Sequence, residues 1–318
     1  MLGPRQAQLT QRHAALLEET LRSSSVEELV TLLWRLRRGL HVDAPRPETL
    51  RQARELELVE PATHPVPRIT PLGAKVSDSL NEYAHWKQRG KRHHSSEEVE
   101  ALRVERLRGK RILEIGCGAG VNLLSLQRCA DVVGIDVEPL YLQFAEILAR
   151  LEGVPVPPRI CGRAERLPFG DASFDIALFH GSLPYMQIEH ALSETARVLR
   201  PGGRVIAIFS DLRQTLRDRL RARSWTMLEP GVFLREARGF AGMIVYPWVG
   251  RLILKPFDPI HTTRRRTRRW LAEAGLRFNA DESRMGSHDV CYVADKPASV
   301  RAQPALRQER REQPMETR

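Results

Sequence analysis

The stretch RILEIGCGAG, residues 111–120, joins a short apolar run to a turn that contains three glycines. An apolar run of this length, bounded by glycines, predicts a buried β-strand. Because glycine has no side chain beyond a hydrogen atom, the backbone of the following turn can approach a ligand closely. The sequence therefore predicts a strand that leads into a ligand-binding turn.

The next residues repeat this alternation of strands and helices. Residues 119–129 and 139–152 predict helices, and the apolar run 131–137 between them predicts a second strand. Such an alternation is typical of a doubly wound α/β domain with a mostly parallel sheet. Asp136 ends the second strand, 20 residues after Gly116. A carboxylate at that place can accept hydrogen bonds from both ribose hydroxyls, so we expect a nucleotide-like cofactor.

Position 121 bears on the class of cofactor. The dinucleotide fingerprint G-x-G-x-x-G requires a small residue there, whereas this sequence has Val121. Its third glycine, Gly120, comes one residue earlier. This spacing disfavours the binding of a pyrophosphate.

Four segments, in order, resemble the motifs of the class I S-adenosylmethionine-dependent methyltransferases, most of all the branch that acts on small molecules. They are LEIGCGAG (113–120), GIDVEP (134–139), GRAERLPFGDASFDIALFHGSLPYM (162–186) and ETARVLRPGGRVIAIF (194–209). Residues 261–278, HTTRRRTRRWLAEAGLRF, are similar to the helix and strand that close that fold. The resemblance implies a seven-stranded, mostly parallel, Rossmann-like sheet with S-adenosylmethionine as the cofactor.

The resemblance also implies a set of cofactor-binding residues, namely Glu114, Gly116, Cys117, Gly118, Gly120, Asp136, Val137, Ala164 and Glu165. The glycines would form the turn against the methionine and ribose parts, and Glu114 would orient the amino end. Asp136 would hold the ribose hydroxyls, and Val137 would pack on the adenine. We interpret Cys117 as a small side chain that the turn tolerates.

One position departs from the family pattern. Arg163 stands where the family often has an acidic residue at the adenine edge, next to Ala164 and Glu165. Arginine has no acceptor for the adenine amino hydrogens. That contact must come from Glu165 or a backbone carbonyl, or else be absent.

His180 and Tyr185 are the candidate catalytic residues. His180 ends the fourth predicted strand, where the family's methyl acceptor lies. If the acceptor is a hydroxyl or a protonated amine, His180 could remove its proton; the alternative is that its ring packs against the cofactor. Tyr185 follows on the same loop and could orient the acceptor. The sequence shows no cluster of Cys and His with metal-ligand spacing, so no metal site is expected.

Two further segments could cover the site. Residues 211–259 are long for a connection and interleave aromatic residues with arginines, which favours a lid over a planar or acidic acceptor. Packing of an inserted helical pair is an equal alternative. Tyr83 and Trp86 precede the α/β core and could close over the cofactor, although aromatic residues at helical spacing more often belong to a core.

Residues 1–90 predict a smaller, mainly helical domain. Three helices, a Pro-rich ribbon and a fourth helix from Leu72 to about Gln88 follow the order of a winged-helix domain, which this segment resembles. In residues 46–68, four arginines are balanced by four glutamates, whereas a DNA-binding face needs positive charge. DNA binding is therefore disfavoured. We expect a packing or dimerisation unit, and in the second case the protein would be a homodimer.

Composition and charge indicate where the protein is located in the cell. The chain has 318 residues and a net charge of +11, most of it in residues 211–318. No apolar run reaches the roughly 18 residues of a membrane helix, and the N-terminus has no signal-peptide core, so we expect a soluble, cytoplasmic protein.

The methyltransferase domain is expected at 91–296. The tail 297–318 lacks apolar periodicity and is expected to be disordered.

Several functions remain open. The leading one is O- or N-methylation of a small metabolite, with an aromatic acceptor favoured by the insert. RNA methylation is an alternative, because residues 211–318 hold 22 basic and 13 acidic residues. Enzymes that methylate base amino groups usually have a [DNS]-P-P-[YFW] box after the fourth strand, where residues 180–185 read HGSLPY. A winged-helix regulator that senses the cofactor is disfavoured by its neutral recognition segment.

Overall fold

A computed structural model describes residues 9–22, 26–37, 42, 45–61, 67–91, 102–213, 237–239, 241–242, 244, 259–285 and 289–298. In chain order, its elements are α1 (Gln11–Arg22), α2 (Val26–Arg37), α3 (Pro47–Glu55), α4 (Pro71–Gln88), α5 (Val104–Leu107), β1 (Arg111–Ile115), α6 (Val121–Leu126), β2 (Asp131–Asp136), α7 (Pro139–Glu152), β3 (Arg159–Cys161), β4 (Phe174–His180), the 3-10 helix η2 (Leu183–Tyr185), α8 (Ile188–Val198), β5 (Leu199–Phe209), α11 (Arg264–Glu273), β6 (Arg277–Met285) and β7 (Val290–Asp295).

The strands form a seven-stranded sheet in the order β3-β2-β1-β4-β5-β7-β6. The pairs from β3 to β5 are parallel, and β7 runs antiparallel to both of its neighbours. This arrangement confirms the predicted doubly wound, mostly parallel sheet. The chain order reverses between β1 and β4, and in open α/β sheets the crevice at the carboxyl ends beside such a point binds ligands.

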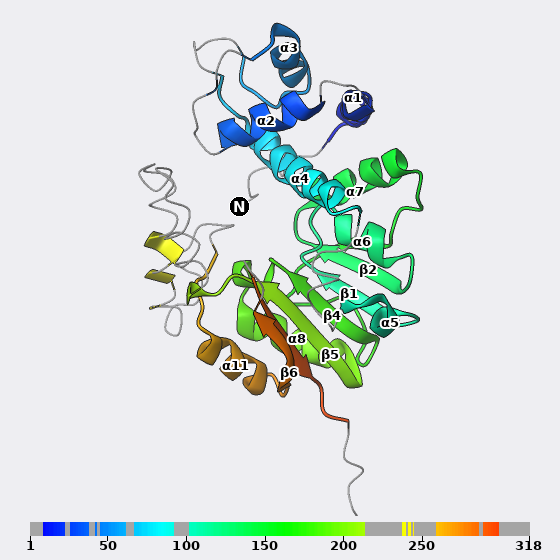
Figure 1. The fold of residues 1–318 in the computed structure, drawn as a ribbon, viewed down its shortest axis with the longest axis vertical. Helices are drawn as coiled ribbons and strands as arrows, with labels where there is room; N and C mark the ends of the chain where they lie inside the picture. Colours follow the sequence, from blue (N-terminus) through cyan, green and yellow to red (C-terminus); the bar gives the residue numbers. More distant parts are fainter. Residues whose placement is uncertain are drawn as a thin grey trace, which may run out of the picture.

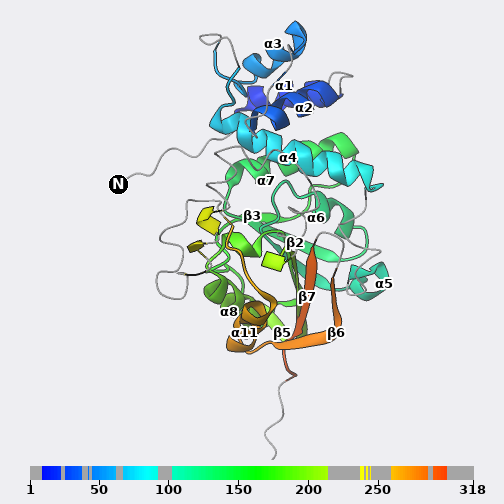
Figure 2. The ribbon, with the colours of Figure 1, turned by 60° about the vertical axis from the view of Figure 1, so that its left-hand side comes forward.

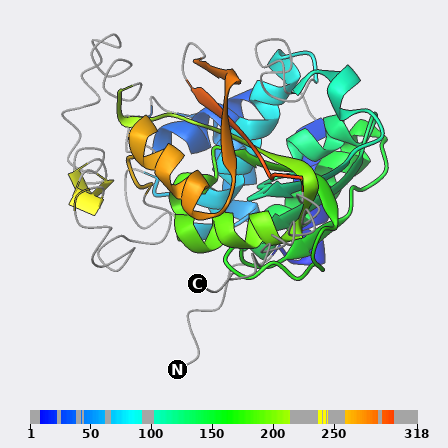
Figure 3. The same ribbon diagram turned by 90° about the horizontal axis from the view of Figure 1, so that it is seen from below.

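Helices cover both faces of the sheet (Figure 1). Along β1, Ile112 packs with apolar residues of α5, α6 and α7, whereas Leu113 and Ile115 pack with those of α8 and α11. This alternation follows from the strand period of two, which sends successive side chains to opposite faces. Seen from below in Figure 3, α8 and α11 lie together on one side of the strands.

The helical unit, residues 9–91, lies above the α6–α7 side of the sheet (Figure 2). A single bridge, Val59 to Ile69, forms its ribbon between α3 and α4. Helix α4 begins at Pro71, and the Thr70 hydroxyl caps it by accepting a 3.0 Å hydrogen bond from the Gly73 N–H. The predicted order of three helices, ribbon and helix is confirmed, while its assignment as a winged helix stays a prediction.

Helix α4 is fixed to the α/β core at several points along its length. Near its start, the Lys75 ammonium pairs with the buried Glu138 carboxylate at 2.5 Å. Near its end, the Trp86 ring is fully buried and its Nε1–H donates to the Ser125 Oγ at 2.7 Å. Between them, the Tyr83 hydroxyl donates to Glu152 at 2.6 Å. These aromatic residues therefore anchor α4 to α6 and α7.

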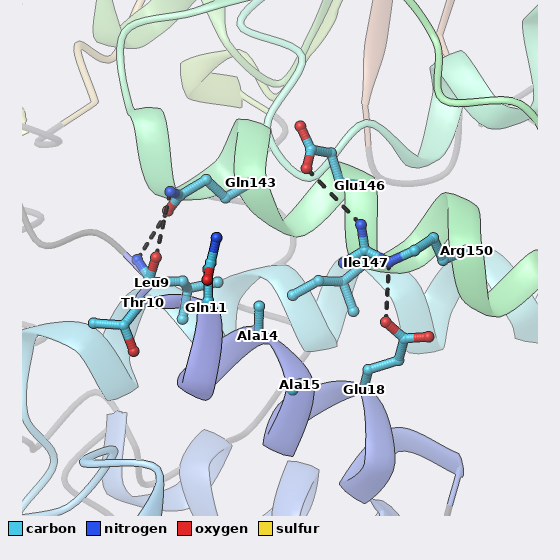
Figure 4. Close-up of a pocket in the computed structure, with 10 residues that line it drawn as sticks. All are labelled: Leu9, Thr10, Gln11, Ala14, Ala15, Glu18, Gln143, Glu146, Ile147 and Arg150. Carbon is cyan, nitrogen blue, oxygen red and sulfur yellow. Dashed lines mark hydrogen bonds and ion pairs between the residues drawn. The ribbon is translucent and has the colours of Figure 1, made fainter.

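The unit and the core also share one apolar cluster. It joins residues of α2 and α4, such as Leu33 and Leu80, to residues of α6 and α7, such as Leu124 and Phe144. Helix α1 adds a polar contact to α7, where a groove of about 400 Å³ separates the two helices (Figure 4). There Arg150 pairs with the Glu18 carboxylate at 3.0 Å.

Two predicted segments lie largely outside the described residues. Of the insert 211–259, the structure describes residues 211–213, 237–239, 241–242, 244 and 259; of the tail 297–318, it describes 297 and 298. Their predicted roles as a lid and a disordered end therefore stay predictions. Within the part of the chain that is described, no helix has the length and apolar character needed to span a membrane.

Candidate functional site

The site lies where β1, β2 and β4 end and where α4 crosses the glycine turn between β1 and α6. Gly116 opens the turn with a φ of +73°, a left-handed conformation that favours glycine. A Cβ at this position would lie 2.4 Å from the Ser182 Cβ, so a larger residue would push the loop after β4 away. The sequence therefore needs glycine here both for conformation and for space.

Asp136 is held rigidly at the end of β2. Its Oδ2 accepts a 2.9 Å hydrogen bond from the Gly118 N–H, and its Oδ1 accepts another of 2.9 Å from the Glu138 N–H. The side chain is half-buried, and desolvation raises the pKa of its carboxyl group. Next to it, Val137 leaves 42% of its surface exposed. The structure thus places a fixed acceptor and an exposed apolar surface side by side.

Glu114 lies under the turn and is 1% exposed. Its Oε1 accepts a 2.9 Å hydrogen bond from the Asn122 Nδ2, whereas its Oε2 is buried without a partner. Desolvation is the main cause that raises the pKa of this carboxyl group to about 8, and the negative charges of Glu82 and Asp136 add to it. Among the described residues this oxygen has no donor, so it is available to accept a hydrogen bond from a bound group.

Glu82 of α4 is a residue of this site that the sequence did not reveal. Its Oε2 accepts a 3.3 Å hydrogen bond from the Ala119 N–H, and a Cβ on Gly118 would lie 3.0 Å from the same oxygen. The side chain remains exposed to solvent. Surrounding protein nevertheless desolvates the carboxyl group, and together with the negative charges of Asp136 and Asp78 it raises the pKa to about 7.

Cys117 is buried in the turn. A Cβ on Gly134 of β2 would lie 2.8 Å from the Cys117 Sγ, which shows how tightly the thiol fills the space beneath the turn. Desolvation, with nearby negative charges, raises the pKa of this thiol well above its ordinary value. A thiol that stays protonated is a poor nucleophile. The structure therefore favours the packing role for this side chain.

The predicted adenine-edge residues follow β3. Ala164 is buried, and Glu165 accepts a 3.0 Å hydrogen bond from the Gln187 N–H through Oε1. The exposed Arg163 lies 3.4 Å from the other oxygen of Glu165. Glu165 thereby connects the segment after β3 to the loop after β4, and Arg163 is its ion-pair partner.

His180 and Tyr185 lie at the carboxyl end of β4 and on η2, the predicted place of the methyl acceptor. The His180 Nδ1 is 3.3 Å from the Asn122 Nδ2, which also donates to Glu114. Since the amide nitrogen can only donate, Nδ1 accepts and the neutral ring carries its proton on Nε2. His180 is thus better suited to donate a hydrogen bond than to remove a proton. Tyr185 is 38% exposed.

The ends of the insert meet near this loop. The Leu212 N–H donates a 2.8 Å hydrogen bond to the Thr262 carbonyl, which joins the residues that leave β5 to those that precede α11. The Ile260 N–H donates a 2.9 Å hydrogen bond to the Pro184 carbonyl of η2. Residues 211–259 therefore begin and end beside the candidate acceptor loop.

The residues present fit S-adenosylmethionine, whose sulfonium and ammonium groups are both cationic. Three carboxyl groups face the turn, those of Glu82, Glu114 and Asp136. Among the described residues, none of these three groups has a lysine or arginine as an ion-pair partner. The ribose hydroxyls have a fixed acceptor in Asp136, and Val137 offers a surface for a ring. No group of side chains suited to hold a metal ion is found among the described residues.

The buried Glu114 makes the stability of the ligand-free protein depend on pH. Its pKa of about 8 in the fold lies above the ordinary 4.5, so the folded state keeps a proton that the unfolded state releases. From pH 6 to pH 8 we expect the free energy of unfolding to fall by about 1 kcal/mol per pH unit from this residue. Denaturant unfolding at both pH values measures the slope. Glu114→Gln should reduce it, and an unchanged slope would contradict this assignment.

Comparison with known proteins identifies the central part of the chain. Residues 113–207 match the family described as "Methyltransferase domain". A phthiotriol/phenolphthiotriol dimycocerosates methyltransferase of Mycobacterium leprae is 37% identical over 111 residues, which are 34% of this chain and 39% of that protein. A fatty-acid O-methyltransferase of Mycolicibacterium smegmatis is 34% identical over 139 residues, 42% of this chain and 46% of that protein. The chain thus spans less than half the length of these curated relatives.

Solved structures give weaker similarity. A crystal structure of an S-adenosylmethionine-dependent methyltransferase from Aquifex aeolicus aligns with a TM-score of 0.44 and 16% identity. The alignment covers 64% of this chain and 92% of the other.

Proposed function

We propose that this chain, whose residues 113–207 form a class I S-adenosylmethionine-dependent methyltransferase domain, transfers a methyl group to an oxygen or nitrogen atom of a small molecule. The observation that carries the proposal is the glycine turn with Asp136 hydrogen-bonded across it. The three acidic groups around this turn, which have no lysine or arginine partner in the part of the chain that is described, support a cationic cofactor, and the loop after β4 offers a place for the acceptor.

S-adenosylmethionine supplies an activated methyl group on a positively charged sulfur. A lone pair of the acceptor atom forms the new bond to the methyl carbon while the carbon–sulfur bond breaks and its electron pair stays on sulfur. The turn and Asp136 would fix the donor, and the loop of residues 180–185 would align the acceptor in line with the methyl group. Alignment and exclusion of water provide most of the acceleration in such a displacement.

An apolar acceptor with a hydroxyl or carboxyl oxygen is the substrate class we favour. Two relatives with different printed activities, on phthiotriol-type lipids and on fatty acids, both modify long apolar molecules. A carboxylate acceptor has already lost its proton and needs no base. A hydroxyl acceptor would release its proton to solvent water as the bond forms, and His180 could orient its oxygen through Nε2–H.

Among the described residues, no comparable observation favours the RNA alternative. Of the five arginines in α11, Arg264 and Arg269 pair with carboxylates of the chain, at 3.3 and 2.7 Å. Arg266 and Arg268 lie over aromatic rings. These contacts give the basic run structural partners, so its charge alone does not indicate a nucleic-acid surface.

Methyl transfer can be tested directly with the purified protein. We expect calorimetric titration to show micromolar binding of S-adenosylmethionine and S-adenosylhomocysteine. Methyl-labelled S-adenosylmethionine should then label fatty acids or long-chain alcohols in preference to small phenols, amines or RNA. If neither ligand binds, the proposal is wrong. If labelling occurs only on RNA or on phenols, the acceptor class is wrong while the enzymatic activity stands.

His180 gives a prediction about the acceptor site. We expect His180→Ala to lower kcat for a hydroxyl acceptor more than tenfold and to leave the Kd for S-adenosylmethionine within about threefold. His180→Gln retains an N–H donor but no base, and should recover part of the loss. Steady-state kinetics and calorimetry measure both effects. A parallel loss of cofactor affinity in the alanine variant would instead indicate that the ring packs against the cofactor.

A further inference from the structure

Glu82 reaches the glycine turn from outside the methyltransferase domain. It lies on α4, while the family match begins at residue 113. Its carboxyl group accepts a 3.3 Å hydrogen bond from the Ala119 N–H, and it lies 3.0 Å from the place where a Cβ on the preceding residue, Gly118, would be. The same Gly118 donates its N–H to Asp136. The carboxyl groups of Glu82 and Asp136 are therefore linked through the backbone of the turn at residues 118 and 119.

The position of Glu82 is fixed by the helix that carries it. One residue further along α4, the Tyr83 hydroxyl donates to Glu152 of α7, and one turn after Glu82 the buried Trp86 bonds to Ser125 of α6. One turn before it, Asp78 lies 3.5 Å from the Tyr141 hydroxyl of α7. Contacts on both sides of Glu82 thus hold this stretch of α4 against the turn, and its carboxyl group does not depend on a loop for its placement.

The charges around Glu82 require a cation. The carboxyl groups of Glu114 and Asp136 are its acidic neighbours across the turn, Asp78 is the one on its own helix, and no lysine or arginine among the described residues pairs with Glu82. The Glu114 Oε2 is buried without a partner in the same cluster, an independent sign that a donor is absent. Because like charges at short range disfavour one another, a positive group bound beside these carboxyl groups would stabilise their charged forms.

We propose that Glu82 is a further cofactor-binding residue and that its carboxylate contacts one of the two cationic groups, the ammonium or the sulfonium, of the methionine part of S-adenosylmethionine. The inference rests on the proposed function and names the helical unit as part of the same site. The ribose end already has its acceptor in Asp136, so the additional negative charge is best matched by the ammonium or sulfonium group. An alternative is that Glu82 only occupies the turn in the ligand-free protein and must leave when ligand binds.

The experiment compares three ligands that differ in charge. S-adenosylmethionine carries the sulfonium, the ammonium and a carboxylate; S-adenosylhomocysteine carries the ammonium and the carboxylate; 5′-methylthioadenosine carries none of these charges. We expect Glu82→Gln to weaken binding of S-adenosylmethionine about tenfold in calorimetry, the loss expected for a charge-assisted hydrogen bond. Binding of 5′-methylthioadenosine should change less than twofold. A loss shared by S-adenosylhomocysteine assigns the contact to the ammonium, and a loss for S-adenosylmethionine alone assigns it to the sulfonium.

Asp78→Asn is the matched control, because it removes the same charge from the same helix while its amide oxygen can still accept from the Tyr141 hydroxyl. It should change each affinity less than twofold. Equal weakening of the binding of all three ligands by Glu82→Gln would overturn the proposal. Unchanged or tighter binding would also overturn it, and tighter binding is the result expected if the Glu82 carboxylate must move out of the turn before the ligand binds. If the wild-type protein binds none of the ligands, the proposed function itself fails, and this inference with it. Thermal unfolding of both variants confirms that the fold is retained.

Discussion

Replacing Asp136 with alanine lowers the affinity for S-adenosylmethionine by about a hundredfold or more. Two effects add. The variant loses the acceptor for the ribose hydroxyls, and each hydrogen bond to a charged group contributes about 1.5–3 kcal/mol. It also loses the hydrogen bonds by which Asp136 holds the Gly118 and Glu138 N–H groups, so the turn itself becomes less ordered. Calorimetric titration of the variant beside the wild-type protein measures the change.

Asp131 provides the control for this prediction. It lies at the other end of the same strand, is exposed, and pairs with Arg111 at 3.3 Å. Exposed ion pairs contribute little to stability, so Asp131→Ala should bind the cofactor within twofold of wild type. An Asp136→Ala protein that binds within threefold of wild type would show that the turn does not hold the cofactor as described.

Trp86→Ala should destabilise the protein by about 3–5 kcal/mol, the cost of removing a fully buried large aromatic ring. The substitution opens a cavity between α4 and α6 and removes the donor to the Ser125 hydroxyl. Urea unfolding followed by circular dichroism measures the loss. Trp86→Phe keeps most of the apolar contact and should cost about 2 kcal/mol or less, because it forfeits mainly one hydrogen bond and part of the ring.

The two variants also distinguish a loss of the contact between α4 and the core from a general destabilisation of the fold. If the alanine variant unfolds at the same urea concentration as wild type, α4 is not anchored through Trp86. A phenylalanine variant as unstable as the alanine variant would mean that the hydrogen bond, and not the filled volume, provides the anchor.

The glycine turn was predictable because its residues are close in sequence. Gly116, Gly118 and Asp136 belong to consecutive segments of one strand-turn-helix-strand unit, whose geometry is fixed by local periodicity and by glycine conformation. The strands were predicted from the same local periodicity, whereas their arrangement in one seven-stranded sheet was implied by the resemblance to the family. The helix after the turn is shorter than predicted, since α6 ends at Leu126 and not at residue 129.

Glu82 could not be found in this way, because its role depends on a tertiary contact across 37 positions of sequence. The pattern drew attention to Tyr83 and Trp86 on the same helix as residues that could cover the cofactor. In the structure both point to α6 and α7 as anchors, and the acidic residue beside them meets the turn. An exposed glutamate on an amphipathic helix has no local signal that separates it from a solvated one.

The apolar cluster shared by the helical unit and the core has a consequence for how the protein can be divided. Cutting the chain near residue 91 would uncover Val121, Leu124, Phe144 and Leu148, which α4 and its neighbours now cover. A contiguous apolar surface of this kind promotes aggregation. The catalytic domain expressed alone would accordingly be poorly soluble, and the intact chain should melt in a single cooperative transition in which both parts are lost together.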